Sequence, residues 1–346
     1  MNIAIISSYL PSTSKMGVGY QVHGLANGLI RRGHAVTILS VCPRPADALY
    51  EVEQVDVRPP MRSLRMSWRL RQIDWARFDV LHAHGDDWFL WNAAVPPHVR
   101  TIHGSCLAEA RHISGIRAKA HMLWLALLET LSVAVADRTV GISINTTRSY
   151  PWIRQVISDG VDLSAFTPGK KESTPTILFV GTYLNRKRGK MLMDIFQNEI
   201  RPALPHAQLW MVCSDAPAAE GVTVFGSIPT EQLTELYRKA WVFCLPSSYE
   251  GFGVPYIEAM ASGTPVIATP NVGAREVLDE GRYGVLAEAK DIGSALLSIL
   301  SDETARTRIA KLGLERAQEF QWEHVIDSYE KLYVEVIGES PAVATI

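Results

Sequence analysis

The 346-residue sequence has few cysteines and almost no net charge. Its four cysteines are far apart and mostly inside apolar runs, which excludes a disulfide framework and predicts buried free thiols in a reducing compartment. They are Cys42, Cys106, Cys213 and Cys244. A formal net charge of −2 creates no field that would attract nucleic acid, so we expect no nucleic-acid partner. The length is sufficient for two domains with separate cores.

The sequence also lacks a run that could span a membrane and a recognisable export signal. Its most apolar long stretch, Ala120–Ala136, has about 17 residues and contains His121 and Glu129, which favours a core helix over a membrane span. No charged and apolar leader precedes Asn2–Ile6, which itself has the pattern of a buried strand. We therefore expect a cytoplasmic protein.

The most informative segment is Pro246–Pro270. It follows the continuous apolar run Trp241–Leu245, which is typical of a parallel strand buried on both faces. The turn Gly251–Gly253 comes next, and Pro255 favours a helix start directly after it. Gly263 is expected to end that helix. The turn therefore lies at the carboxyl edge of a sheet and at a helix N-terminus, an arrangement that favours an anion such as a diphosphate.

Two carboxylates flank this predicted anion site. Glu250 and Glu258 would repel phosphate, so we expect each to accept hydrogen bonds from hydroxyl groups at opposite ends of the anion. Glu258, expected in the first helical turn, would also gain from the helix dipole. Two hydroxyl-bearing groups joined by a diphosphate describe a nucleotide sugar. The alternative for the pair is one loop carboxylate and one helix residue without a ligand.

These residues resemble glycosyltransferase family 4, the retaining nucleotide-sugar enzymes of the GT-B fold. The resemblance is carried by Glu250–Pro255, Glu258–Ala261, Gly263–Ala268 and Gly273–Ala274. It implies an α/β protein with two Rossmann-like, doubly wound parallel-sheet domains that face each other across a cleft. By the same resemblance, Glu258 would bind the ribose hydroxyls and Glu250 would lie beside the donor sugar. The donor diphosphate would bind at Gly251, Phe252, Gly253 and Val254.

The resemblance covers nearly the whole chain and implies its domain division. Residues 1–160 would form an acceptor-side domain, joined by a C-terminal crossover helix at about 320–340. Residues 161–319 would form the donor-binding domain. Within it, Pro229 lies where relatives hold the base through backbone groups. The resemblance also implies that no metal is required and that no cofactor is needed beyond the donor, a UDP-, GDP- or ADP-sugar.

A cluster of cations follows the strand predicted at Thr176–Val180, beside the expected anion site. The family places an arginine directly after the glycine of this loop and a lysine five residues later. Here Thr182 occupies the arginine position and Lys187 the lysine position. Either Arg186 or Arg188 would supply the second charge of a diphosphate clamp, and the sequence does not decide between them.

In the first half of the chain, a strand, a glycine loop and a helix begin the fold. The family has two glycines in this loop; Met16 replaces the first, and Gly17 is the candidate for approach to the donor phosphate. His103, followed by Gly104 at a strand end, matches the family's Thr-x-His-Gly pattern. The resemblance makes His103 a contact of the donor sugar and the acceptor.

The run Asp79–Asp87 has the appearance of a metal site, but we expect no metal there. The GT-B fold uses no Asp-x-Asp clamp, and His82 and His84 are expected on opposite faces of their strand. His84 and Asp86 are instead candidates for lining the acceptor site.

A helix predicted from Met61 to Ile73 places Arg62, Arg65 and Arg69 on one face. Two interpretations of this arginine face remain open. One is a docking surface for anionic lipid or a phosphorylated acceptor, which would put the protein at the inner face of the membrane. The other is an ordinary solvated helix face.

We therefore predict a retaining glycosyltransferase that moves a hexose from a nucleoside diphosphate sugar to an unidentified glycan, lipid or small-molecule acceptor. His103, Lys187 and Glu250 are the predicted catalytic residues. The alternatives are a GT-B epimerase or hydrolase of sugar nucleotides, and a non-catalytic subunit that binds them.

Overall fold

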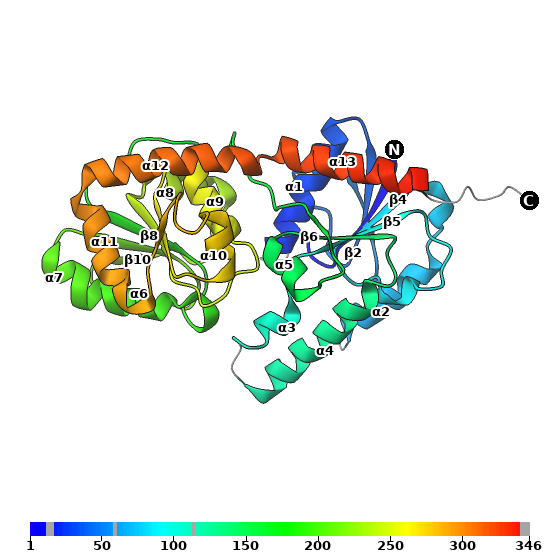
Figure 1. Cartoon of the computed structure of the whole chain (residues 1–346), viewed down its shortest axis with the longest axis horizontal. Helices are drawn as coiled ribbons and strands as arrows, with labels where there is room; N and C mark the ends of the chain where they lie inside the picture. Colours follow the sequence, from blue (N-terminus) through cyan, green and yellow to red (C-terminus); the bar gives the residue numbers. More distant parts are fainter. Residues whose placement is uncertain (12–16, 58–60, 113–114, 340–346) are drawn as a thin grey trace, which may run out of the picture. The chain divides into compact units, whose positions relative to one another are not determined.

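The computed structural model describes residues 1–11, 17–57, 61–112 and 115–339. The chain divides into two compact units. One consists of residues 1–108, 120–160 and the chain from Trp322 onward, and the other of Glu109–Lys119 and Val161–Gln321. Each unit contains one sheet in which every described strand pair is parallel, with helices around it, as Figure 1 shows. The predicted pair of parallel-sheet α/β domains is confirmed.

The sheet of the first unit has seven strands in the order β3-β2-β1-β4-β5-β6-β7. The strands are β1 (Asn2–Ile6), β2 (Ala35–Ser40), β3 (Glu51–Gln54), β4 (Val80–Ala83), β5 (His98–Ile102), β6 (Arg138–Gly141) and β7 (Gln155–Val156). Its helices are α1 (Gly17–Arg31), α2 (Arg62–Arg69), α3 (Cys106–Glu109), α4 (Ile116–Ser132), α5 (Ile144–Ser149) and α13 (Trp322–Glu339), α3 and α4 having residues in both units.

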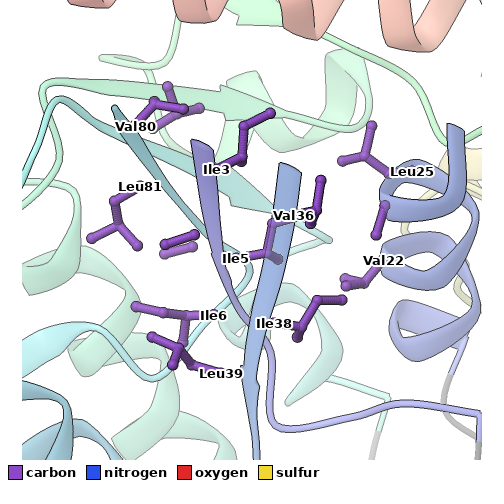
Figure 2. Close-up of a cluster of buried hydrophobic side chains, with 14 of the residues drawn as sticks. Ile3, Ile5, Ile6, Val22, Leu25, Val36, Ile38, Leu39, Val80 and Leu81 are labelled. Carbon is purple, nitrogen blue, oxygen red and sulfur yellow. The ribbon is translucent and has the colours of Figure 1, made fainter. Parts of the chain in front are cut away.

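The core of this unit forms where β1 lies between β2 and β4. Ile3, Ile5 and Ile6 are fully buried, since both faces of the central strand are covered. Figure 2 shows them among side chains of β2, β4 and α1. On the helical side, α13 packs against α1 at two glycines. A Cβ on Gly24 would lie 2.3 Å from the Trp322 ring, and one on Gly28 would lie 2.2 Å from Ile326.

The sheet of the second unit has six strands in the order β10-β9-β8-β11-β12-β13. The strands are β8 (Thr176–Val180), β9 (Gln208–Val212), β10 (Val222–Val224), β11 (Val242–Leu245), β12 (Val266–Ala268) and β13 (Val285–Leu286). Its helices are α6 (Gly189–Ile195), α7 (Arg201–Ala203), α8 (Thr230–Lys239), α9 (Val254–Ala261), α10 (Val272–Val277), α11 (Ile292–Ser301) and α12 (Glu303–Ala317).

Two helices differ from the sequence-based expectation. The helix expected at Met61–Ile73 ends at Arg69 and continues as a 3-10 turn, Leu70–Gln72. The expectation of a core helix within Ala120–Ala136 is wrong. Helix α4 lies there, but it buries only one face: Ala126 and Leu128 are buried, whereas most of its large apolar side chains are exposed. None of the four cysteines forms a disulfide, and three of them, all except Cys106, are buried.

Candidate functional site

The loop between β11 and α9 forms the centre of the candidate site in the second unit. Gly253 adopts φ 111°, a value that favours glycine, and α9 starts directly after it with Pro255 in its first turn and no side-chain cap. The loop also packs against the start of α10 at Gly273. A Cβ there would lie 2.3 Å from the carbonyl oxygen of Phe252 and 2.8 Å from that of Glu250. Only glycine allows this approach without movement of the backbone.

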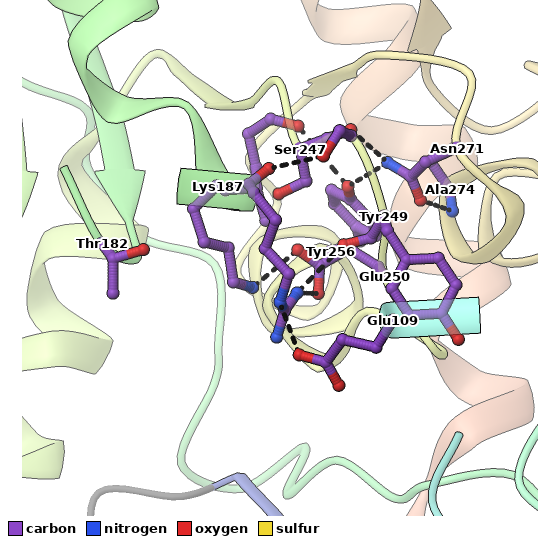
Figure 3. A network of polar contacts seen from close by, with 12 residues as sticks. Glu109, Thr182, Lys187, Ser247, Tyr249, Glu250, Tyr256, Asn271 and Ala274 are labelled. Carbon is purple, nitrogen blue, oxygen red and sulfur yellow. Dashed lines mark hydrogen bonds and ion pairs between the residues drawn. The ribbon is translucent and has the colours of Figure 1, made fainter. Parts of the chain in front are cut away.

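Asn271 holds the other side of the loop. Its side-chain oxygen accepts a hydrogen bond from the Ala274 amide at 3.0 Å and so caps α10. Its amide nitrogen donates to the carbonyl oxygen of Ser247 and to the hydroxyl of Tyr256, both at 3.1 Å (Figure 3). The loop is therefore fixed between two helix starts, as a preorganised ligand site requires.

Glu250 is buried at the centre of a partly exposed cluster of charged side chains. Its side chain is 6% exposed; Oε1 lies 2.7 Å from Nζ of Lys187, and Oε2 lies 3.0 Å from Nη1 of Arg186 (Figure 3). Arg186 also contacts Oε1 of Glu109 at 3.3 Å. Burial alone would raise the pKa of Glu250, but the two cations outweigh burial and hold that pKa below its ordinary value. Glu250 is therefore a carboxylate at neutral pH.

The cation loop, which includes a 3-10 turn at Asn185–Lys187, is joined to the Glu250 loop through the backbone as well. Nη1 of Arg186 donates to the carbonyl oxygen of Tyr249 at 3.0 Å, and the amide of Ser248 donates to the carbonyl oxygen of Arg186 at 2.8 Å. Among the described residues, the cations that contact Glu250 are thus Arg186 and Lys187. Arg188 instead occupies a left-handed turn with φ 56°. Thr182 donates locally to the carbonyl oxygen of Leu184 at 2.9 Å.

Glu258 lies on α9 and pairs with a tyrosine that the sequence did not single out as functional. The hydroxyl of Tyr237, on α8, donates to Oε2 of Glu258 at 2.9 Å. Burial raises the pKa of Glu258 to about 7, although Tyr237 and Lys187 act in the opposite direction. Its expected place in the first turn is wrong, because α9 begins at Val254 and Glu258 is its fifth residue. Pro229 immediately precedes α8, with φ −65°.

In the first unit, two histidines at neighbouring strand ends form a pair. Nδ1 of His84, after β4, lies 2.7 Å from Nε2 of His103, after β5. Nδ1 of His103 lies 3.6 Å from Oδ1 of Asp159. Burial holds the pKa of His84 well below its ordinary value, so His84 is neutral at pH 7. The sequence analysis singled out both His84 and His103 but gave no signal for their pairing.

The expectation that His82 and His84 point to opposite faces is wrong. Their rings are 4.2 Å apart, because residues two apart along an extended chain project to the same side. His82 is fully buried, with Nδ1 2.7 Å from the Tyr333 hydroxyl and Nε2 2.8 Å from Oγ1 of Thr101. It therefore links β4 and β5 to α13.

The remaining candidates lie in less defined surroundings. Gly17 is the first residue of α1 and has open space where a Cβ would project; Met16 lies outside the described residues. Asp86 is buried and accepts a hydrogen bond from Ser8, and burial raises its pKa. Arg62, Arg65 and Arg69 are all exposed on α2.

Metal ligation and membrane crossing find no support in the part of the chain that the structure describes. No group of three or more His, Cys, Asp or Glu side chains in the described ranges is arranged to hold a metal ion. Within the same ranges, no helix combines the length and the apolar character needed to cross a membrane.

Comparison with known proteins gives consistent results. The family model "Glycosyltransferase Family 4" matches residues 16–165, and "Glycosyl transferases group 1" matches residues 174–302. A glycogen synthase of Mycobacterium tuberculosis is 26% identical over 398 residues, covering 96% of this chain and 94% of the relative.

Two solved structures are similar over nearly their whole length. Sucrose-phosphate synthase from Thermosynechococcus elongatus has a TM-score of 0.81 at 22% identity and covers 98% of this chain and 100% of its own. Anabaena HepE in complex with UDP-glucose has a TM-score of 0.77 at 17% identity, and the match covers 97% of this chain and 100% of the HepE chain. The family models and the shared fold agree: this chain belongs to the family 4 glycosyltransferases and is a glycosyltransferase of the GT-B type.

Proposed function

We propose that this glycosyltransferase takes a hexose from a nucleoside diphosphate sugar and transfers it with retention of anomeric configuration. The observation that carries the proposal is the cluster of Arg186, Lys187 and Glu250 on loops that follow two neighbouring parallel strands, β8 and β11. Carboxyl ends of parallel strands are where open α/β sheets bind nucleotides. The complex of HepE with UDP-glucose supports a donor of this class.

In the proposed binding mode, the diphosphate occupies the region between the cations and the Gly251–Gly253 turn. Lys187 and Arg186 already lie within 3.0 Å of carboxylate oxygens of Glu250, so both side chains are oriented before an anion arrives. Charge accumulates on the diphosphate as the bond to the sugar breaks. Preorganised cations and backbone amides stabilise that charge most in the transition state.

Glu258 would accept hydrogen bonds from the ribose hydroxyls, since its side chain lies on α9, one helix turn beyond the diphosphate turn. Glu250 would lie beside the sugar. Because both of its oxygens are engaged by cations, Glu250 is proposed to stabilise positive character on the sugar ring and not to attack it. His103, paired with His84, would contact the sugar and the acceptor.

The test has two stages. A thermal-shift panel of UDP-, GDP- and ADP-sugars identifies the donor, because only a ligand that binds the native state raises the melting temperature. The chosen donor is then incubated with candidate acceptors, and NMR of the product gives the anomeric configuration. Transfer with an α-linked product from an α-linked donor supports the proposal. If the donor yields free sugar or an epimer in the absence of an acceptor, the protein is a hydrolase or an epimerase. If the donor binds but is not turned over, the protein is a non-catalytic subunit.

A further inference from the structure

Helix α4 carries an apolar stripe that no described part of the protein covers. Its residues Ile116, Leu123, Trp124, Leu127 and Leu131 are between 48% and 90% exposed. At 3.6 residues per turn these side chains fall within an arc of about 100°. The buried residues Ala126 and Leu128 lie outside that arc. Packing within the first unit, to which residues 120–132 of α4 belong, therefore does not account for the stripe.

The charges on α4 are distributed unevenly around the stripe. Arg117 and Lys119 are exposed and flank it, one on each side of the arc. The single carboxylate of the helix, Glu129, is turned inward. Its Oε2 accepts a hydrogen bond from the Cys106 amide at 3.0 Å and another from the Tyr150 hydroxyl at 2.5 Å. The outward face of α4 thus combines large apolar side chains with positive charge and contains no acid.

We propose that the outward face of α4 lies on an anionic lipid surface. A helix that lies in a membrane interface typically has Lys or Arg on its polar face and Trp, Phe or Leu side chains on its apolar face. Helix α4 has both, with Trp124 among the leucines of its stripe. Its 17 residues span about 25 Å, which suits a helix lying along the surface. A second copy of this chain would bring the same basic residues to the contact, whereas anionic headgroups neutralise them.

The test uses the full-length protein and sedimentation with two kinds of vesicle, pure phosphatidylcholine and an equal mixture of phosphatidylcholine and phosphatidylglycerol. Wild type is expected to sediment mainly with the anionic vesicles. The triple variant Leu123→Gln, Leu127→Gln, Leu131→Gln removes the centre of the stripe and should reduce partitioning at least tenfold, because each buried apolar side chain contributes to the transfer free energy. The exposed residues Val334 and Ile337 of α13 provide the matched control, and their change to Gln should leave partitioning unaltered.

Two further measurements probe the charge and the aromatic residue of this face separately. Arg117→Gln with Lys119→Gln should weaken binding about 10- to 30-fold at low salt and much less at high salt. Lipids brominated in the acyl chains should quench the fluorescence of wild type more than that of Trp124→Phe, which places Trp124 in the interface. Circular dichroism and melting temperatures of all variants should match wild type, since the changed side chains are exposed.

Three outcomes would overturn the proposal. If the wild-type protein sediments with neither kind of vesicle, α4 does not bind lipid. The same conclusion follows if the triple variant partitions to the vesicles as strongly as wild type does. A wild-type dimer in light scattering that the triple variant dissociates would assign the stripe to a second copy of this chain.

Discussion

Nζ of Lys187 lies 2.7 Å from Oε1 of Glu250, although the two residues are far apart in the sequence. They meet because β8 and β11 are adjacent parallel strands, whose carboxyl ends place the following loops side by side. Arg186 completes the cluster at 3.0 Å from the other oxygen. The carboxylate thus fixes both cations in position, and each of the three residues can be tested for a separate role.

Replacement of Lys187 by alanine should slow the chemical step. The lysine is proposed to stabilise charge on the leaving diphosphate, so Lys187→Ala is expected to lower kcat by roughly two to three orders of magnitude, with a smaller change in donor affinity. Lys190→Ala is the control, because that lysine is exposed and pairs with Asp194 on the same helix. Steady-state kinetics with varied donor give both parameters. A loss of affinity alone would show that Lys187 anchors the ground state.

The two glutamates should differ in which kinetic constant they control. Glu258→Ala is expected to raise the KM for donor roughly 10- to 150-fold with little change in kcat, because contacts with the ribose are shared by ground and transition states. Glu250→Ala should lower kcat. It also removes the carboxylate that pairs with Lys187 and one of the two that pair with Arg186, so the free nucleoside diphosphate should bind this variant at least as well as wild type. Isothermal titration measures how tightly each variant binds the nucleoside diphosphate. If Glu250→Ala no longer binds it and Glu258→Ala still does, the donor lies in the opposite orientation to the one proposed.

The raised pKa of Glu258 predicts a pH dependence of stability. The folded protein holds this proton up to about pH 7, whereas the unfolded chain releases it near 4.5. Between these values the folded state binds more protons, so the free energy of unfolding falls as pH rises, by up to about 3 kcal/mol. Glu258→Gln lacks this titration and should gain stability relative to wild type between pH 5 and pH 8. Urea unfolding of wild type and Glu258→Gln at pH 5 and at pH 8 gives the free energy of unfolding of each protein. If that free energy changes equally with pH in both proteins, the pKa of Glu258 is not raised.

Gly24 should not tolerate a side chain. Alanine is favoured over glycine in a helix by about 1 kcal/mol, but its Cβ would lie 2.3 Å from the Trp322 ring, and overpacking of this kind costs about 1–3 kcal/mol. We therefore expect Gly24→Ala to lower the melting temperature. Gly338→Ala on α13 is the control, because nothing lies within 4 Å of a Cβ there. Equal melting temperatures for the two variants would indicate that Trp322 moves freely.

The arginine face of α2 can be tested by sedimentation with the same two kinds of vesicle as α4. Arg62, Arg65 and Arg69 are exposed beside Trp68, which is 59% exposed. If they dock on anionic lipid, their joint change to Gln should weaken binding to anionic vesicles, most steeply at low salt. Unaltered binding would leave the three arginines as a solvated helix face.

The sequence by itself determined the parallel sheets and the position of the donor loop, because these depend on local patterns. A continuous apolar run such as Trp241–Leu245 is stable mainly as a strand covered on both faces. Gly253 and Pro255 set the turn and the helix start through their own backbone preferences. The motif around Glu250 was therefore recognisable before any contact was known.

Only the tertiary structure decided which side chains meet. Arg186 contacts Glu250, whereas Arg188 adopts a left-handed conformation directly before α6, and nothing in the order of the two arginines predicts that difference. The pairing of His84 with His103 depends on the order of β4 and β5 in the sheet. The exposed stripe of α4 has the same origin: composition predicts an apolar helix, but which of its faces finds a partner depends on packing between elements distant in the chain.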